Sequence, residues 1–351
     1  MVYEQKKETS EGKEEINLIN IIELKIQNQD SLIRTDILQP RFSWKLTDEK
    51  SGIKQNAYQI IVFKKETSGI KKIIWDSNKV SSKETINIQY QGPSLQSRKI
   101  YYWQVRVWCS NGEESTWSHE GEWEMGLLNE GDWVAKWIEP NQENVTEEPE
   151  LTLEDMFINK KKSTQLSPEK RLHPPKLVRK SFEVHDKKIE KARLYITAHG
   201  LYHARINGQR VTEAEFTPDF TSYSNYLQYQ TYDILPYLSE GENVLGVILA
   251  DGWYAGRISI PGGSGQFGSR LGLLAQFEII FSDGSKQVMG TDDTFLSSDS
   301  HYVYSDIFIG EKQDKTIEKA GWDRPGYQGL THKWSSVEVV NYQLNNLRAQ
   351  Y

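Results

Sequence analysis

The chain has 351 residues, of which 26% are charged, with a formal net charge of -7 and a mean hydropathy of -0.65. Acidic and basic residues are interspersed, which argues against a nucleic-acid partner because phosphate binding needs a clustered basic face. No apolar run approaches the roughly 20 residues of a membrane-spanning helix, so no membrane partner is expected. The single cysteine, Cys109, excludes an intrachain disulfide framework.

Residues 1–25 are expected to form a flexible, solvated lead-in to the first domain. Residues 1–15 are charged throughout and lack the apolar core of a secretion signal. A cytoplasmic location is therefore expected.

Residues 26–129 carry short strand signals at regular spacing and show no helical periodicity. Strands are predicted over residues 41–46, 58–63, 73–76 and 100–108. In the last of these, Tyr102, Gln104, Arg106 and Trp108 face opposite to Tyr101, Trp103, Val105 and Val107. The pattern predicts an immunoglobulin-like or fibronectin-III-like sandwich.

Residues 130–345 are predicted to form a jelly-roll-like β-sandwich with a polar surface insertion at 141–175. Asn207-Gly208 suits a two-residue hairpin turn, and residues 243–250 are almost wholly apolar, as in a strand buried on both faces. Further strands are predicted over residues 192–198, 202–206, 228–232, 271–281, 287–290 and 302–309. The fold class is all-β, with two tandem β-sandwiches.

The best candidate binding residues follow the apolar strand 243–250 and are Asp251, Trp253, Tyr254 and Arg257. An indole ring can stack on the C–H face of a sugar, while a carboxylate and a guanidinium hydrogen-bond its hydroxyl groups. The competing interpretation, which composition alone favours, is that the aromatic residues cap the core and Asp251 forms the turn.

Other polar residues give weaker signals. Asp219 and Tyr223 lie in a loop that could share the same end of the sandwich. Asp306, Glu311 and Asp314 admit an acid–base pair for glycoside hydrolysis, but carboxylates at a strand end are ordinarily surface groups. The histidines have no helical metal-ligand spacing. From its own residues the chain shows no convincing catalytic apparatus.

Several short segments, in order, resemble the amino-terminal half of bacterial α-L-rhamnosidases over about residues 32–350. In the first domain they are LIRT at 32–35, PRFSW at 40–44, QNAYQ at 55–59, WDS at 75–77, YYW at 101–103, WS at 117–118 and GLL at 126–128. In the second they are ARLY at 192–195, ING at 206–208, YQTYD at 229–233, DGWYAG at 251–256, GE at 310–311 and GWD at 321–323.

The resemblance implies a fibronectin-like domain and a jelly-roll-like sandwich. In the family these precede an (α/α)-barrel glycoside hydrolase domain that carries the acidic catalytic residues. No counterpart of that barrel is expected here, so the chain is expected to be inactive alone, to support a barrel and to contact rhamnose-containing carbohydrate. Asp306, Glu311 and Asp314 are assigned to the interface between domains.

The cofactor and two alternative functions stay open. Some family members bind rhamnose with calcium through a sandwich in this region, but no calcium ligand is carried over to a residue here, so no cofactor is assigned and calcium is left open. The chain could instead be a free-standing lectin-like module that recognises rhamnosides, or a purely structural spacer.

Overall fold

The computed structural model describes residues 19–30, 33–47, 54–66, 69–146, 148, 151–161, 166–258, 263–331 and 333–350. The chain divides into two bodies, Met1–Met125 and Gly126–Tyr351. Most of the lead-in expected over residues 1–25 lies outside the described residues, as do parts of the insertion expected over 141–175. Within the described residues, no helix has the length and apolar composition of a membrane span.

The first body is a sandwich of two sheets. Strands β1, β3 and β7 form one sheet, and the other has the order β2-β9-β8-β4-β5, with β6 paired to β4. The strands are β1 (Asn20–Ile26), β2 (Ile33–Thr35), β3 (Arg41–Thr47), β4 (Gln55–Lys65), β5 (Lys71–Asp76), β6 (Val80–Ser81), β7 (Ile88–Gln89), β8 (Ile100–Cys109) and β9 (Gly121–Met125).

Strand β8 shows why these residues form a sandwich. Its side chains alternate between buried and half-exposed along its whole length, as expected for a strand with one face on the core. On the buried face Trp103 packs against Phe42 of the opposite sheet, with ring centroids 4.6 Å apart. The predicted alternation is confirmed, and it gives the first body an aromatic core.

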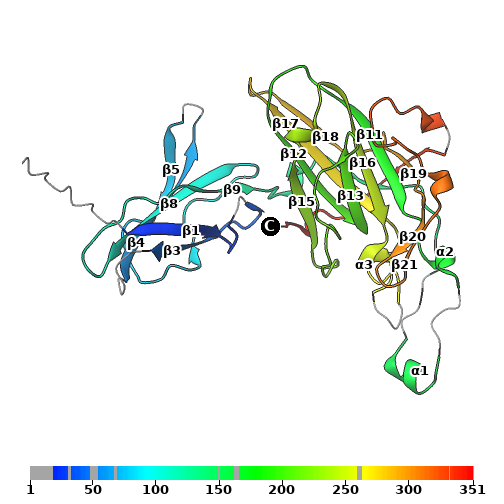
Figure 1. Cartoon of the computed structure of the whole chain (residues 1–351), viewed down its shortest axis with the longest axis horizontal. Coiled ribbons are helices and arrows are strands. Elements are labelled where there is room, and N and C mark those ends of the chain that lie inside the picture. The colour runs from blue at the N-terminus through cyan, green and yellow to red at the C-terminus, as the bar shows by residue number, and fades with distance from the viewer. Residues whose placement is uncertain are drawn as a thin grey trace, which may run out of the picture. The chain divides into compact units, whose positions relative to one another are not determined.

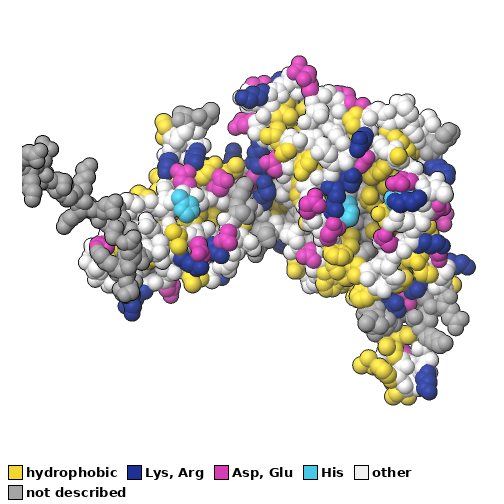
Figure 2. All heavy atoms as spheres, viewed as in Figure 1, with side chains coloured by type: hydrophobic (Ala, Val, Ile, Leu, Met, Phe, Trp, Pro, Cys, Tyr) yellow, Lys and Arg dark blue, Asp and Glu magenta, His cyan; other side chains and the backbone are white. Residues whose placement is uncertain are grey.

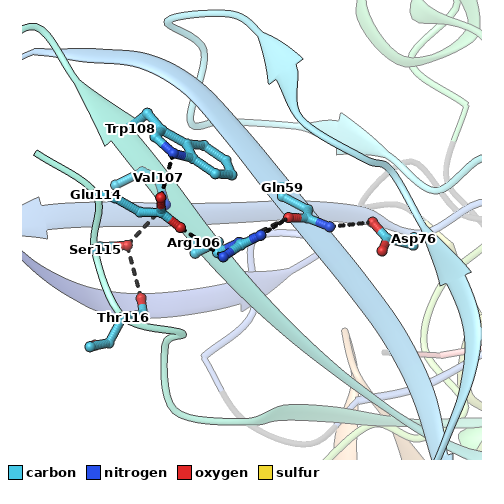
Figure 3. A network of polar contacts seen from close by, with 8 residues as sticks. All are labelled: Gln59, Asp76, Arg106, Val107, Trp108, Glu114, Ser115 and Thr116. Atoms are coloured by element: carbon cyan, nitrogen blue, oxygen red, sulfur yellow. Dashed lines mark hydrogen bonds and ion pairs between the residues drawn. The ribbon is translucent and has the colours of Figure 1, made fainter. Parts of the chain in front are cut away.

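The outer face of β8 carries a continuous polar network around Arg106 (Figure 3). The Arg106 guanidinium donates to Gln59 Oε1 at 2.7 and 2.9 Å and to Glu114 Oε1 at 2.7 Å. It also lies 4.9 Å from the ring centroids of both Trp108 and Trp117. Arginine suits this position because its planar group can hydrogen-bond at its edge and stack on aromatic faces.

The second body is a larger sandwich. One sheet has the order β23-β10-β17-β12-β15-β24, with β18 paired to β17, and the other has the order β14-β13-β16-β11-β19-β22. Its strands are β10 (Trp137–Glu139), β11 (Lys176–Val184), β12 (Ile189–His199), β13 (Leu201–Ile206), β14 (Gln209–Arg210), β15 (Leu227–Asp233), β16 (Gly241–Ala250), β17 (Gly272–Phe281), β18 (Lys286–Gly290), β19 (Leu296–Asp299), β20 (Tyr302–Asp306), β21 (Gly310–Gln313), β22 (Ser335–Ser336), β23 (Glu338–Val340) and β24 (Leu347–Ala349).

The core of the second body lies between its two sheets, which face one another in Figure 1. Strand β16 is central in its sheet and buried over most of its length, so the prediction of a strand covered on both faces is confirmed. Asn207 and Gly208 have φ of +51° and +83° and connect β13 to β14. Such angles are those of the tight hairpin that this dipeptide predicts.

Short helical segments supplement the strands, and two of them, α1 (Leu153–Phe157) and α2 (Pro168–Arg171), lie within the polar insertion. The others are α3 (Gly252–Ala255) and the single turns η1 (Glu130–Asp132), η2 (Leu235–Tyr237), η3 (Lys315–Ile317) and η4 (Gly329–Thr331). The hairpin of β20 and β21, the helix α3 and the helix α2 gather at one end of the second body (Figure 1). The candidate site lies at this end.

Candidate functional site

The predicted tip after β16 is the one-turn helix α3. Gly252 begins this helix with φ +53°. A Cβ at this position would lie 2.4 Å from Leu201 Cγ, so a glycine is needed both for the backbone angle and for the close approach to β13. The helix turns the chain sharply, which separates the four residues predicted to act together.

Asp251 is buried, with 1% of its surface exposed. Its carboxylate accepts a hydrogen bond from the His173 backbone N–H at 2.8 Å and lies 2.6 Å from His173 Nδ1. Because both oxygens have partners inside the protein, the prediction that Asp251 binds a sugar does not fit the structure. Asp251 instead holds the end of the polar insertion against α3.

Arg257 and Asp306 are also committed to internal contacts. Arg257 Nη2 lies 3.4 Å from Glu148 Oε1, whose other oxygen accepts from Arg171 Nη1 at 2.6 Å. The Arg257 backbone N–H donates to Asp306 Oδ2 at 3.0 Å, and Asp306 Oδ1 accepts from Phe308 and Ile309. Asp306 therefore ends β20, earlier than the strand predicted over 302–309, and being buried it is unavailable for an interface between domains.

Trp253 is half-buried, packs against the core of the second body and belongs to a cluster of aromatic rings. Its ring centroid is 5.7 Å from those of both Phe216 and Phe220, which are 52% and 49% exposed. We call Phe216, Phe220 and Trp253 the aromatic platform. Figure 2 shows hydrophobic side chains gathered at this end of the second body. The sequence singled out Trp253 but not the two phenylalanines, although aromatic residues on both sides of Pro218-Asp219 are unusual for a solvated loop and were an available signal.

Tyr254 and Tyr223 pack beneath the platform. The Tyr254 ring stacks on His199 at 4.4 Å between centroids, and burial raises the pKa of its hydroxyl to about 12. The Tyr223 hydroxyl donates to the backbone oxygen of Asp219 at 3.0 Å, and burial raises its pKa further. For these two tyrosines the core interpretation fits the structure, whereas Asp219 itself is exposed beside Phe220.

The remaining predicted carboxylates lie nearer the surface. Asp314 accepts from the Thr316 hydroxyl and backbone N–H, which lower its pKa, and it begins the turn η3. Glu311 is exposed on β21 and accepts from Gln313 Nε2 at 2.5 Å. An interface role for these two residues stays a prediction. Asp306 does not support the alternative of an acid–base pair, because backbone N–H groups already donate to both oxygens of its carboxylate.

A pocket of about 240 Å³ opens on the outer face of β13 and β16, next to the platform. We call it the sheet pocket. It lies between the loop that carries Glu215 and Phe216 and the β20–β21 hairpin. Its lining residues are Pro175, Leu201, Tyr202, His203, Glu215, Phe216, Ile248, Ala250, Gly252, Tyr302, Ser305, Asp306, Ile307 and Glu311.

One wall of the sheet pocket is an ordered polar group. Glu215 accepts from Arg210 Nη1 at 2.9 Å, and its other oxygen lies 2.8 Å from His203 Nε2. Arg210 and, next, His203 lower the pKa of the Glu215 carboxyl group, so it is a hydrogen-bond acceptor and not a general acid. His203 and Glu215 come from different elements, and no local pattern could have paired them.

Metal binding has little support in the described residues, where no group of three or more His, Cys, Asp or Glu side chains is placed to hold an ion. The calcium left open by the resemblance is untested.

The two tandem sandwiches place the chain in the class of all-β proteins with two domains. Residues 21–129 match the Rha78A-like N-terminal immunoglobulin domain, and residues 187–351 match the alpha-L-rhamnosidase N-terminal domain. The chain thus belongs to the α-L-rhamnosidase family and carries these two of its domains.

Individual relatives agree with this assignment. The chain is 33% identical over 304 residues to an alpha-L-rhamnosidase of Formosa agariphila, covering 86% of this chain and 31% of that protein. It is 33% identical over 307 residues to one of Alteromonas sp. (strain LOR), covering 85% of this chain and 30% of that protein. The chain therefore spans about a third of the length of these curated relatives.

The solved structures show the same correspondence. The native α-L-rhamnosidase of Aspergillus terreus superposes with a TM-score of 0.78 and 30% identity, covering 94% of this chain and 35% of that one. The α-L-rhamnosidase of Dictyoglumus thermophilum gives a TM-score of 0.80 and 28% identity, covering 95% and 36%. The all-β fold and the resemblance found in the sequence are confirmed.

Proposed function

We propose that the two bodies form the accessory part of an enzyme that hydrolyses terminal α-L-rhamnosides, and that they support its catalytic domain. In the described residues, two of the three carboxylates first considered for acid–base chemistry serve the fold: Asp306 accepts backbone N–H groups, and Asp314 begins a helical turn. An acid–base pair needs one carboxyl group with a raised pKa, and Glu215 has a lowered one.

The second part of this proposal is that the aromatic platform contacts rhamnose-containing carbohydrate. The observation that carries it is the exposure of Phe216 and Phe220 beside Trp253. Large apolar rings at a surface are costly to leave in water and mark contact sites. A pyranose ring offers them a flat C–H face, and Asp219 at the platform edge can accept from its hydroxyl groups.

The test of the platform is a titration of the chain with L-rhamnose, followed by tryptophan fluorescence and by saturation-transfer NMR. Both signals are expected for the native chain, and Trp253→Ala should lose both. Trp253→Phe is the matched control: it keeps a flat ring, so NMR should still report binding while the fluorescence change disappears. The proposal that the platform binds sugar would be refuted if Trp253→Ala bound L-rhamnose as the native chain does. It would also be refuted if calorimetry of the native chain detected no heat at millimolar sugar.

The non-catalytic part of the proposal is tested separately with an aryl α-L-rhamnoside. The chain is expected to release no aryl alcohol above the buffer rate. Turnover that Glu311→Gln abolishes would overturn this expectation, because it would assign acid–base chemistry to the second body.

A further inference from the structure

We propose that the sheet pocket is a second saccharide subsite, so that the second body binds a neutral oligosaccharide with one ring on the aromatic platform and a neighbouring ring in the pocket. This inference rests on the proposed carbohydrate contact at the platform and extends it.

The first argument is that the pocket and the platform are continuous. Phe216 lines the pocket, and its ring centroid lies 5.7 Å from that of Trp253. Gly252, which also lines the pocket, immediately precedes Trp253 in α3. A chain of sugars that stacks on Trp253 therefore reaches the pocket through Phe216 without crossing other protein surface.

The second argument is the chemistry of the lining. Leu201, Ile248 and Ile307 supply apolar surface, whereas His203, Glu215 and Glu311 supply polar groups. An apolar floor with a few convergent polar groups is the usual make-up of a small-molecule site. At about 240 Å³ the pocket lies just below the roughly 300–1,000 Å³ typical of drug-sized ligands, which suits a single sugar ring.

The third argument concerns charge. Three carboxylates line the pocket, Glu215, Asp306 and Glu311, and His203 is the basic side chain among its lining residues. Glu215 is paired with Arg210 and His203, and Asp306 accepts backbone N–H groups, so the exposed Glu311 is the carboxylate that accepts from a sugar, while the group as a whole stays negative. Carboxylates accept hydrogen bonds from sugar hydroxyl groups but repel other anions. A neutral sugar is therefore favoured over a uronic acid. In this role Glu311 contacts the saccharide rather than a neighbouring domain.

The fourth argument is the backbone at Phe216, which has φ +59°. This angle is an outlier for a bulky residue, and such strain tends to persist where a site needs a side chain held in place. Here it holds a ring that is 52% exposed between the pocket and Trp253. The exposed ring contributes little burial to compensate for the strain.

The test compares a monosaccharide, L-rhamnose, with a neutral rhamnose-containing disaccharide and with the matching disaccharide whose second ring is a uronic acid. Calorimetry on the full chain is expected to show the neutral disaccharide binding about tenfold more tightly than L-rhamnose, as one or two added hydrogen bonds would give. The uronic acid form should lose this gain at low salt and recover part of it as added salt screens the carboxylates.

Variants assign the gain to the pocket. Glu311→Gln should weaken binding of the neutral disaccharide about tenfold and leave the affinity for L-rhamnose unchanged. Glu318→Gln, an exposed carboxylate outside the pocket lining, is the control and should change neither. Phe216→Gly should weaken binding of the disaccharide. The melting temperature of this variant should equal or exceed that of the native chain, since glycine accepts the positive φ. A purely structural Phe216 would instead lower the melting temperature.

The outcomes separate the two proposals. If L-rhamnose binds in a Trp253-dependent way but the disaccharide binds no tighter, the second subsite is wrong and the platform stands. If the disaccharide binds and Glu311→Gln weakens it, while Trp253→Ala has no effect on either sugar, the pocket stands and the platform is wrong. If neither sugar binds, both are wrong.

Discussion

The two bodies differ on the outer faces of their sheets: one face carries a closed polar network, and the other carries a pocket bordered by a loop and a hairpin. In the first body, Arg106 on β8 has partners that come from the same face, and the polar groups there satisfy one another (Figure 3). In the second body, the outer face of β13 and β16 is bordered by a loop and by the β20–β21 hairpin, which together form the sheet pocket.

This difference teaches that a β-sandwich does not itself create a binding site. Both faces alternate buried and exposed residues in the same way, as the burial of β8 and β13 shows. In the second body, the loop that carries Glu215 and Phe216 and the β20–β21 hairpin border the outer face of the sheet, and the pocket lies between them. The outer face of the first body is also hollowed beside Trp108, but its Arg106 network is closed on itself, so the second body is the better candidate for ligand contact.

The largest expected effect breaks the buried support of the second body. Asp251→Ala removes the acceptor of the His173 backbone N–H and ring. Loss of one partner from such a buried polar pair should lower the free energy of unfolding of the second body by about 3–5 kcal/mol. Denaturant unfolding followed by a probe in that body measures it.

The control for this variant is Asp219→Asn. Asp219 is exposed, and its φ of +86° suits asparagine as well. The free energy of unfolding of the Asp219→Asn variant should differ from that of the native chain by less than about 0.5 kcal/mol. Equal effects of the two substitutions would contradict a supporting role for Asp251.

A smaller effect, dependent on pH, should appear in the second body through His199. Its ring lies between those of Trp137 and Tyr254, at 4.3 and 4.4 Å between centroids, and burial lowers its pKa from 6.5 to about 4. Between these values the unfolded chain holds a proton that the folded chain does not. Stability should therefore fall as the pH falls from 6.5 to 4, by up to roughly 3 kcal/mol.

The pH effect is isolated by comparing unfolding curves of the native chain and His199→Phe at several pH values. Phenylalanine keeps a ring in the stack but cannot titrate, so the variant should lose less stability below pH 6.5. Parallel pH dependence in the two proteins would exclude His199 as the cause.

The smallest expected effect tests the polar network on the outer face of the first body. Arg106→Lys cannot keep both the hydrogen bonds to Gln59 and Glu114 and the stacking between Trp108 and Trp117. A loss of about 1 kcal/mol is expected for this partly exposed network, measured by amide hydrogen exchange in β4 and β8. Lys45→Arg, at an exposed position of β3, should leave exchange unaltered, and sugar binding should be unaffected by both.

Much of the fold could be predicted because strand formation is written in local patterns. Alternation over residues 100–108, the apolar run over 243–250 and the turn at Asn207-Gly208 each involve neighbours in the chain, and all three appear in the structure. The ordered short segments likewise identified the family. Errors occurred where a side chain ended an element, as Asp306 does for β20.

By itself, the sequence determined the all-β class and most of the strands, and it identified Trp253 as a candidate binding residue. Only the tertiary structure decided that Asp251 is buried against His173, 78 residues away, and that the exposed rings of Phe216 and Phe220 lie against the half-buried Trp253. The physical reason is that periodicity records which face of a strand is buried, whereas a site depends on which distant loops meet above that face.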